Sequence, residues 1–170
     1  MTDHVDEVLK QWARERPDLD VSPMAVIGRL SRVSQLLAVE LGRTFADHDL
    51  DHPSFDVLAT LRRSGPPYAL SPTALMRSSM VTSGAISQRL GRLEARGLVE
   101  RTPRPTDGRG TDVRLTDQGR ALVDQALPDH VATEQRLLAA LTDRQCTDLA
   151  NLLRELLQSL DEQAAVAGSS

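Results

Sequence analysis

Apolar residues recur every three or four positions along most of the chain, which is the spacing of amphipathic helices. The first such segment ends before Pro17. A longer one begins at Ser22 and Pro23, a pair typical of a helix N-cap and first turn. The apolar faces of these two segments consist of Val5, Val8, Leu9, Trp12, Ile27, Leu30, Leu37, Leu41 and Phe45. We therefore expect two helices before residue 53.

Three shorter helical segments follow. One begins near Pro53 and ends at the turn-forming run of residues 64–67, and a second begins at Ser71. The third begins at Thr82, and Gly97 stands where a helix C-terminus favours left-handed backbone. The inward faces are expected to consist of Phe55, Leu58, Leu61, Ile86, Leu90 and Leu93.

The pattern changes after Gly97. Residues 98–102 and 112–115 are typical of short strands, and residues 103–110 between them are rich in proline, glycine and arginine. We expect a hairpin with a long, basic tip.

Helical spacing returns in the C-terminal third. Thr116 is expected to cap a helix that Pro128 kinks or ends, and a further helix is expected over residues 131–141. Thr142 and Gln145 have the spacing of a capping box. The helix behind them carries one apolar stripe: Leu149, Leu152, Leu153, Leu156, Leu157 and Leu160. This stripe suits a partner helix as well as an intrachain core.

The order of elements defines a fold class. We predict a mainly α-helical chain with a small β-hairpin, in which a winged helix-turn-helix is flanked by N- and C-terminal helices. The expected parts are N-terminal helices over residues 1–52, a DNA-binding lobe over 53–120, C-terminal helices over 121–163 and a tail over 164–170.

Charge is unevenly distributed. The chain holds 20 basic and 24 acidic residues, yet residues 61–120 contain eleven arginines against five acids. A basic centre between acidic flanks is typical of a protein that binds a polyanion. An arginine-rich solvated surface gives the same count, so charge alone leaves the two readings open.

The predicted helix-turn-helix supplies candidate DNA contacts. A recognition helix enters the major groove by its N-terminal residues, which must be small or polar there, and basic residues on a hairpin tip reach phosphate or minor groove. The predicted DNA-binding residues are Ser71, Thr73, Thr82, Ser83, Gly84, Ser87, Gln88, Arg92, Arg104, Asp107 and Arg109.

The combined motifs resemble the MarR family of bacterial transcriptional regulators. Residues 75–94 resemble its helix-turn-helix, residues 97–101 and 115–119 resemble the segments that bracket its wing, and Asp107 with Arg109 matches its wing Asp-x-Arg. The resemblance implies that the N- and C-terminal helices are dimerisation helices of a homodimer that binds a pseudo-palindromic duplex and acts as a repressor. The acidic N-terminus lacks the charge and apolar core of a signal peptide, so we expect a cytoplasmic protein.

An extra N-terminal helix with a tryptophan resembles the urate-responsive branch of that family. The four residues that mark the branch fall on Trp12, Asp56, Arg89 and Arg101. The resemblance implies that a small anionic aromatic effector, such as urate or a related purine, stacks on Trp12 and pairs with Arg89, and that Asp56 pairs with Arg101. A phenolic or other organic acid, or no effector at all, are the alternatives within the family. A protein-interaction module with a basic docking lobe is the alternative outside it.

Other chemistry has weaker support. His48 and His52 lie four residues apart among acids, but the proline that follows favours a solvated loop over a metal site. Cys146 has no second cysteine to pair with and is expected to pack as a plain thiol. No catalytic or cofactor-binding motif is present, so we expect neither an enzyme nor a cofactor. No apolar run approaches the ~20 residues of a membrane span.

Overall fold

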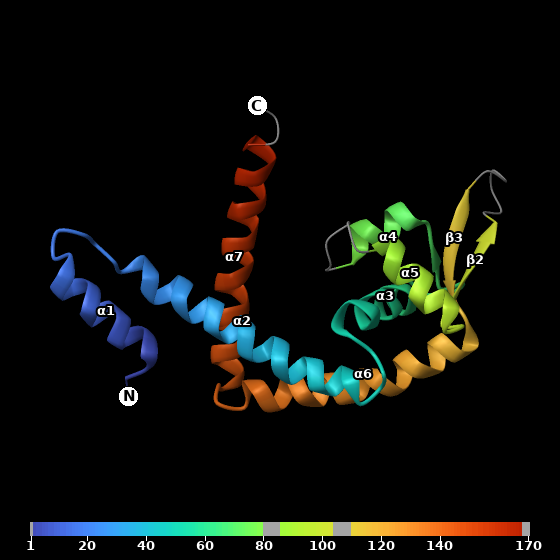
Figure 1. Ribbon diagram of the computed structural model, residues 1–170, viewed down its shortest axis with the longest axis horizontal. Helices are drawn as coiled ribbons and strands as arrows, with labels where there is room; N and C mark the ends of the chain where they lie inside the picture. The colour runs from blue at the N-terminus through green and yellow to red at the C-terminus, as the bar shows by residue number, and fades with distance from the viewer. Residues whose placement is uncertain (1, 80–85, 104–109, 168–170) are drawn as a thin grey trace. The chain divides into compact units, whose positions relative to one another are not determined.

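A computed structural model describes residues 2–79, 86–103 and 110–167, with the side chains of Ile86 and Ser87 outside the description. The chain divides into two compact units, residues 1–131 and 132–170. The first unit contains a helical hairpin, a lobe of short helices with a three-stranded sheet, and most of a long helix that continues into the second (Figure 1). The predicted mainly helical fold is confirmed.

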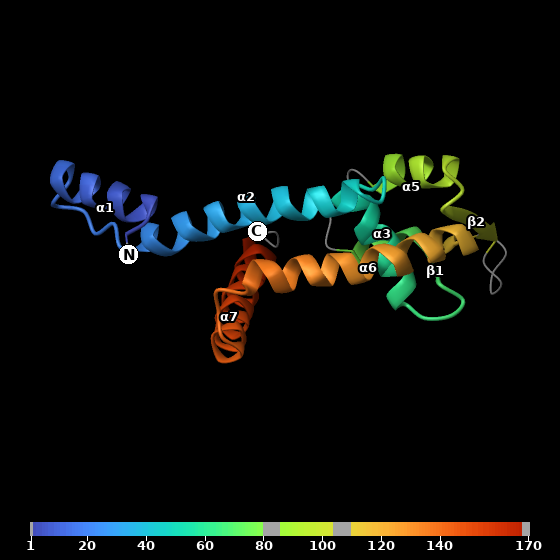
Figure 2. The same ribbon diagram turned by 90° about the horizontal axis from the view of Figure 1, so that it is seen from below.

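Helices α1 (His4–Glu15) and α2 (Pro23–Ala46) form the N-terminal hairpin, with α1 lying alongside the first turns of α2 (Figure 2). Asp3 caps α1 in a capping box with Asp6. Pro23 lies in the first turn of α2 as predicted, but the expected side-chain cap is wrong. Ser22 has helical backbone angles, and its hydroxyl donates to Asp20 at 3.1 Å instead.

The lobe consists of α3 (His52–Arg63), β1 (Ala69–Leu70), α4 (Pro72–Ser78), α5 (Ile86–Ala95), β2 (Val99–Pro103) and β3 (Thr111–Leu115). Its sheet is antiparallel in the order β1-β3-β2, with Val99 opposite Leu115 and Ala69 opposite Arg114. The sequence predicted β2 and β3 as a two-stranded hairpin. Strand β1 was missed because two residues show no alternation.

Leucine, valine and phenylalanine side chains from α2, α3, α4, α5, β2, β3 and α6 meet in one core. It contains the predicted inward residues of α3 and, on α5, Leu90 and Leu93, whereas the side chain of Ile86 lies outside the described residues. Its fully buried members are Phe45, Val57, Leu58, Leu61, Leu75, Leu93, Leu98, Val113 and Val123. This core fixes the lobe's helices against its sheet. The exposed side of the lobe is therefore held in one geometry.

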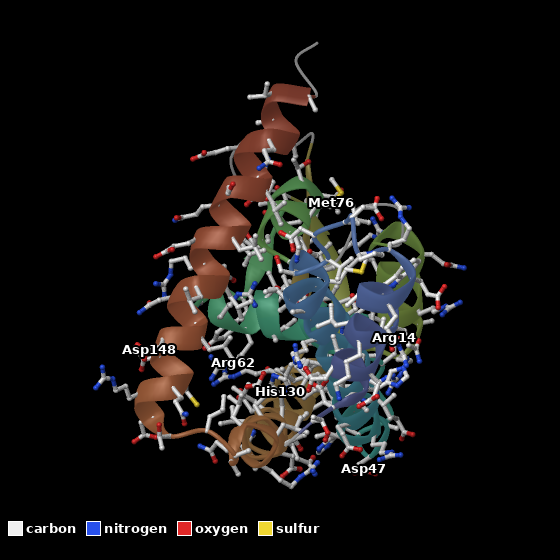
Figure 3. The ribbon with its side chains drawn as sticks, turned by 90° about the vertical axis from the view of Figure 1, so that its left-hand side faces the viewer. Arg14, Asp47, Arg62, Met76, His130 and Asp148 are labelled. Carbon is white, nitrogen blue, oxygen red and sulfur yellow. The ribbon has the colours of Figure 1, made fainter. Side chains whose placement is uncertain are left out.

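Helix α6 (Asp117–Leu138) continues through Pro128, so the two predicted helical segments are one helix and the alternative that Pro128 ends it is wrong. Helix α7 (Asp143–Ala167) begins with the predicted capping box, in which Thr142 and Gln145 bond reciprocally. It extends to Ala167, beyond the predicted start of the tail. Its charged side chains, among them Asp148, project outward from the helix (Figure 3).

The loop before α3 differs from its prediction at His48. The His48 side chain is 8 % exposed, and its Nε2 lies 2.9 Å from Oδ2 of Asp129 on α6, so the solvated-loop prediction is wrong for this residue. Within the described ranges, no three metal-ligating side chains gather into a group. The same ranges contain no helix both long and apolar enough to span a bilayer.

Candidate nucleic-acid interface

The C-terminal end of α5 is fixed by a glycine turn. Gly97 has φ +67°, its N–H bonds to Glu94 O at 2.9 Å, and the Leu98 N–H bonds to Leu93 O at 2.9 Å. This is the Schellman arrangement that only glycine adopts without strain. The predicted role of Gly97 is confirmed, and the chain leaves α5 directly into β2.

Thr116 connects this turn to α6. Its hydroxyl donates to Gly97 O at 2.6 Å and accepts from the Gly119 N–H at 3.0 Å. The Thr116 N–H also donates to Leu98 O at 3.2 Å. Gly119 lies so close to Leu98 that a Cβ there would stand 1.9 Å from Leu98 O. Thr116 therefore caps α6 as predicted and joins α5, β2 and α6.

Two predicted DNA contacts on α5 face outward. Gln88 and Arg92 are exposed, whereas Leu90 and Leu93 on the opposite face are 3 % and 1 % exposed and belong to the core. Because the hydrophobic face of α5 packs on the core, its polar face is exposed to solvent. This is the arrangement that a groove-reading helix requires.

The short helix α4 lies before α5. Ser71 caps it, with its hydroxyl accepting the Ala74 N–H at 3.1 Å, and Thr73 is exposed in its first turn. The remaining predicted contacts, Thr82, Ser83, Gly84, Arg104, Asp107 and Arg109, lie outside the described residues, as does the side chain of Ser87.

The arginines of the basic centre fall into two groups. Most are held by a named partner: Arg62 by Asp124 at 2.7 Å, Arg96 by Asp49 O at 2.7 Å and Arg101 by Glu94 at 3.2 Å. In the part of the chain that the structure describes, Arg77 on α4 and Arg92 on α5 are exposed and make no ion pair or hydrogen bond. Their charges are available to phosphate. Arg77 was counted in the basic centre but not singled out by sequence, because only the structure separates it from the paired arginines.

Arg89 differs from its neighbours on α5. Its side chain is 15 % exposed, and Nη2 lies 3.7 Å from Oδ2 of Asp51, the N-cap of α3. Burial raises the pKa of Asp51, but hydrogen bonds from Ser54 and the charge of Arg89 outweigh it, so the net pKa is lowered. The carboxylate stays ionised at neutral pH and ties α5 to α3.

The structure brings together only some of the predicted effector-binding residues. Asp56 is 5 % exposed in the middle of α3, with Arg63 at 4.0 Å, and Arg89 contacts the first turn of the same helix. Arg101 pairs with Glu94, so the expected pair between Asp56 and Arg101 is not formed.

Trp12 lies on a different part of the chain. It is 41 % exposed on α1, which packs on the first turns of α2, whereas α3 contacts the other end of that helix. The 19 residues from Gly28 to Ala46, the end of α2, span ~27 Å. A pocket containing Trp12 and Arg89 of one chain is therefore not present.

A helix-turn-helix with an outward polar face, a flanking β-hairpin and unpaired arginines defines a winged-helix DNA-binding protein. The MarR family model matches residues 48–110. The transcriptional regulator PecS from Dickeya dadantii is 42 % identical over 149 residues, which cover 88 % of this chain and 90 % of PecS. The chain belongs to the MarR family of DNA-binding transcriptional regulators.

Solved structures of MarR-family regulators are also similar to this chain. Sco3205, a MarR-family regulator from Streptomyces coelicolor solved in complex with DNA, is similar with a TM-score of 0.75 and 27 % identity, covering 84 % of this chain and 93 % of Sco3205. BpsR from Bordetella bronchiseptica, whose DNA binding is regulated by 6-hydroxynicotinic acid, has a TM-score of 0.70 and 28 % identity, covering 77 % and 91 %.

Proposed function

We propose that the protein is a homodimeric repressor that binds a pseudo-palindromic operator and is released by a small anionic aromatic effector such as urate or a related purine. The observation that carries the effector part is the pair between Arg89 and Asp51, which ties the recognition helix α5 to α3. A mostly buried arginine held by a single carboxylate is a site where a second anion competes.

The competition explains release. An effector anion that takes the guanidinium of Arg89 displaces the Asp51 carboxylate and frees α5 from α3. Coupling of this kind is typically worth ~1–3 kcal/mol, which weakens operator binding about 5–150-fold. Support comes from BpsR, whose DNA binding responds to 6-hydroxynicotinic acid, an aromatic heterocycle that carries an acidic group.

The planar ring of the effector needs an aromatic face. Because Trp12 lies on α1, we propose that a second copy of the chain supplies it, so that Trp12 of the partner subunit and Arg89 line one pocket. A two-fold axis permits this, since it places one region of a chain against a different region of its partner. A monomer would then bind the effector weakly.

Dimerisation also serves DNA binding. Two recognition helices about one turn of duplex apart, ~34 Å, read the two half-sites of a palindrome. The exposed leucines of α7 offer a surface for the second copy, because no residue of this helix is buried.

The test is a titration of urate, xanthine and salicylate into the protein bound to its own upstream intergenic duplex, following duplex retention and Trp12 emission together. Urate is expected to release the duplex and quench Trp12. Arg89→Gln should abolish both effects. Asp51→Asn should strengthen effector binding because it removes the competing carboxylate, and Arg144→Gln, at a 92 % exposed side chain on α7, serves as the matched control.

The outcomes separate the alternatives. Release by salicylate alone would indicate a phenolic-acid effector. Duplex binding that no compound changes would sink the effector proposal while leaving the repressor, and failure to bind any upstream duplex even at low salt would overturn both.

A further inference from the structure

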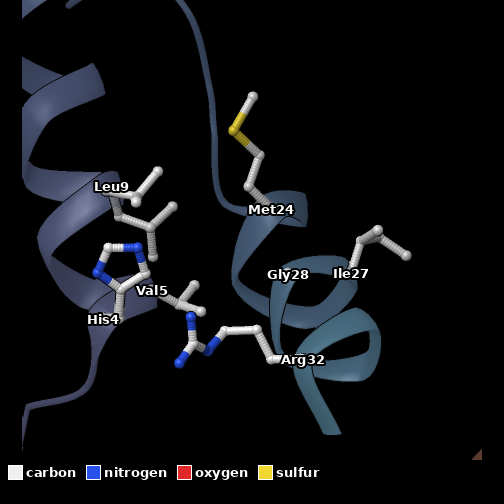
Figure 4. Close-up of a pocket in the computed structure, with 8 residues that line it drawn as sticks. His4, Val5, Leu9, Met24, Ile27, Gly28 and Arg32 are labelled. Atoms are coloured by element: carbon white, nitrogen blue, oxygen red, sulfur yellow. The ribbon is translucent and has the colours of Figure 1, made fainter. Parts of the chain in front are cut away.

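A second cavity lies in the N-terminal hairpin, away from α3 and α5. It is a groove of about 420 Å³ between α1 and α2, within the size range of small-molecule sites. Its main walls are Val5, Val8 and Leu9 on α1 and Met24, Ile27 and Arg32 on α2 (Figure 4). Trp12 is not among its lining residues, so the groove is distinct from the proposed effector pocket.

The floor of the groove depends on a glycine. A Cβ built at Gly28 would stand 3.3 Å from Cγ1 of Val5, tighter than ordinary van der Waals contact. Gly28 therefore lets α1 approach α2 closely. Val5 is 6 % exposed as a result, although the rest of α1 has no buried residue.

An ion-pair cluster holds the same end of the hairpin together. The Arg29 guanidinium reaches Asp3 at 2.9 Å and Asp6 at 2.6 Å, across 26 and 23 residues of sequence. Both carboxylates have lowered pKa values, first because each accepts a backbone N–H of the other's residue and further because of Arg29. These two acids are therefore engaged and do not neutralise the next arginine on α2.

That next arginine is Arg32. Its guanidinium points from α2 toward α1, beside Val5 and His4, at the edge of the aliphatic walls (Figure 4). Among the residues that the structure describes, no ion pair or hydrogen bond engages it. An apolar groove with one unpaired cation at its edge has the complement of an anionic head on an apolar body.

We propose that this groove binds an amphipathic monocarboxylate, with its aliphatic chain along Val8, Leu9 and Ile27 and its carboxylate on Arg32. Apart from His4 and Arg32 at its edge, the lining is aliphatic, which favours a flexible alkyl chain over a planar ring. Because the ligand bridges α1 and α2, its binding stabilises the hairpin by linkage. The hairpin is then a second ligand-binding element, independent of the urate-like effector.

Calorimetric titration of octanoate into the full-length protein tests the site without DNA. We expect saturable binding of one octanoate per chain. Arg32→Gln should weaken it about tenfold, the cost of one hydrogen bond to a charged group. Octan-1-ol, which has the same chain without the charge, should bind wild type and Arg32→Gln equally. Equal octanoate affinity for the two proteins would overturn the proposal.

A matched pair of glycines on α2 tests the groove itself. Gly28→Ala inserts a methyl group against Val5 and should weaken octanoate binding severalfold. Gly42→Ala makes the same change on the same helix, where a Cβ would meet nothing within 4 Å, and should leave binding unchanged.

The other occupant to consider is a second copy of the chain. If a partner covers the groove, wild type binds no octanoate, and Leu9→Glu shifts the protein toward monomers in light scattering. That result would overturn the proposal and assign the groove to the dimer interface.

Discussion

Gly119 shows how one residue fixes the base of the hairpin formed by β2 and β3. Any side chain there meets the Leu98 backbone, with a Cβ 1.9 Å from the carbonyl oxygen and 2.8 Å from the carbonyl carbon. Backbone atoms cannot rotate away as a side chain does. We therefore expect Gly119→Ala to lower the free energy of unfolding by about 2–3 kcal/mol through overpacking, measured by urea denaturation.

Gly42→Ala is the control for this prediction. It adds the same methyl group to a helix where nothing lies within 4 Å, so helix propensity alone acts and should stabilise by up to ~1 kcal/mol. Equal effects of the two substitutions would show that the contact between Gly119 and Leu98 is relieved at little cost.

The unpaired arginines lead to a prediction on DNA affinity. Arg77→Gln and Arg92→Gln should each weaken operator binding and reduce the slope of log K against log[salt] by about 1, since each removes one phosphate contact. Arg101→Gln, where Glu94 holds the guanidinium, should change the slope less. Binding isotherms by fluorescence anisotropy at four salt concentrations measure these slopes. An unchanged slope for both the Arg77→Gln and Arg92→Gln variants would exclude the two arginines from the interface.

Sequence reasoning at the residue scale succeeded where a local rule applied. Gly97, Thr116 and the Thr142 capping box follow from short-range backbone chemistry. The partners of Arg89 and Arg101 did not follow, because ion pairs depend on tertiary contacts: Asp51 caps a different helix, and Glu94 lies across a turn. The prediction that the Ser22 side chain caps α2 was wrong for a local reason, because the Ser22 hydroxyl donates its hydrogen bond to Asp20.

At the scale of elements, the α1–α2 hairpin has a predictable acid response. The pKa values of Asp3 and Asp6 lie below their ordinary value of 3.8, so the stability that these carboxylates contribute is present above that pH and is lost as pH falls through the lowered values. We expect α1 to detach below about pH 3.8. Because Trp12 is the single tryptophan of the chain and lies on α1, its fluorescence emission measures the detachment of this helix.

Variants separate this response from general unfolding. Arg29→Gln should move the Trp12 transition to higher pH, because the bridge from α1 to α2 is lost. Lys10→Gln should not, since Lys10 pairs with Glu7 on α1 alone. Coincidence of the Trp12 transition with the loss of helical circular dichroism in every variant would argue against separate detachment of α1.

Element prediction was accurate for long periodic segments and poor at short or interrupted ones. Six of the seven helices that the structure describes follow from apolar spacing, with α6 accounting for two predicted segments, and α4 follows from the start signal at Ser71 and Pro72. Strand β1 forms because β3 offers it a partner, and the Leu115 N–H bonds to Tyr68 O at 3.1 Å beside it. The buried contact of His48 with Asp129 joins residues 81 apart in sequence, which no local pattern reveals.

For the whole molecule, the exposed leucines of α7 predict a dimer. Leu152 and Leu157 are 64 % and 61 % exposed, and a helix with an uncovered apolar stripe is an association surface. Leu157→Glu should yield monomers at micromolar concentration in light scattering and weaken operator binding more than 100-fold, since one half-site contributes only part of the specific free energy.

The adjacent residue provides the control. Gln158→Glu adds the same charge one position along the helix, outside the leucine stripe, and should leave the dimer intact. A monomeric wild-type protein, or a dimeric Leu157→Glu variant, would exclude α7 as the interface.

The hydrogen bonds by which Thr116 connects α5 to α6 have a consequence for operator choice. Hydrogen bonds from Thr116 to Gly97 O and Leu98 O fix the end of α5 against the start of α6. Substitutions on the outward face of α5 then alter which bases are read. For the proposed dimer, we expect the tolerated separation of half-sites to depend instead on the direction in which α6 leaves Thr116. In the proposed dimer on a palindrome, Thr116 is therefore expected to influence half-site spacing through the position of α6 rather than through a base contact.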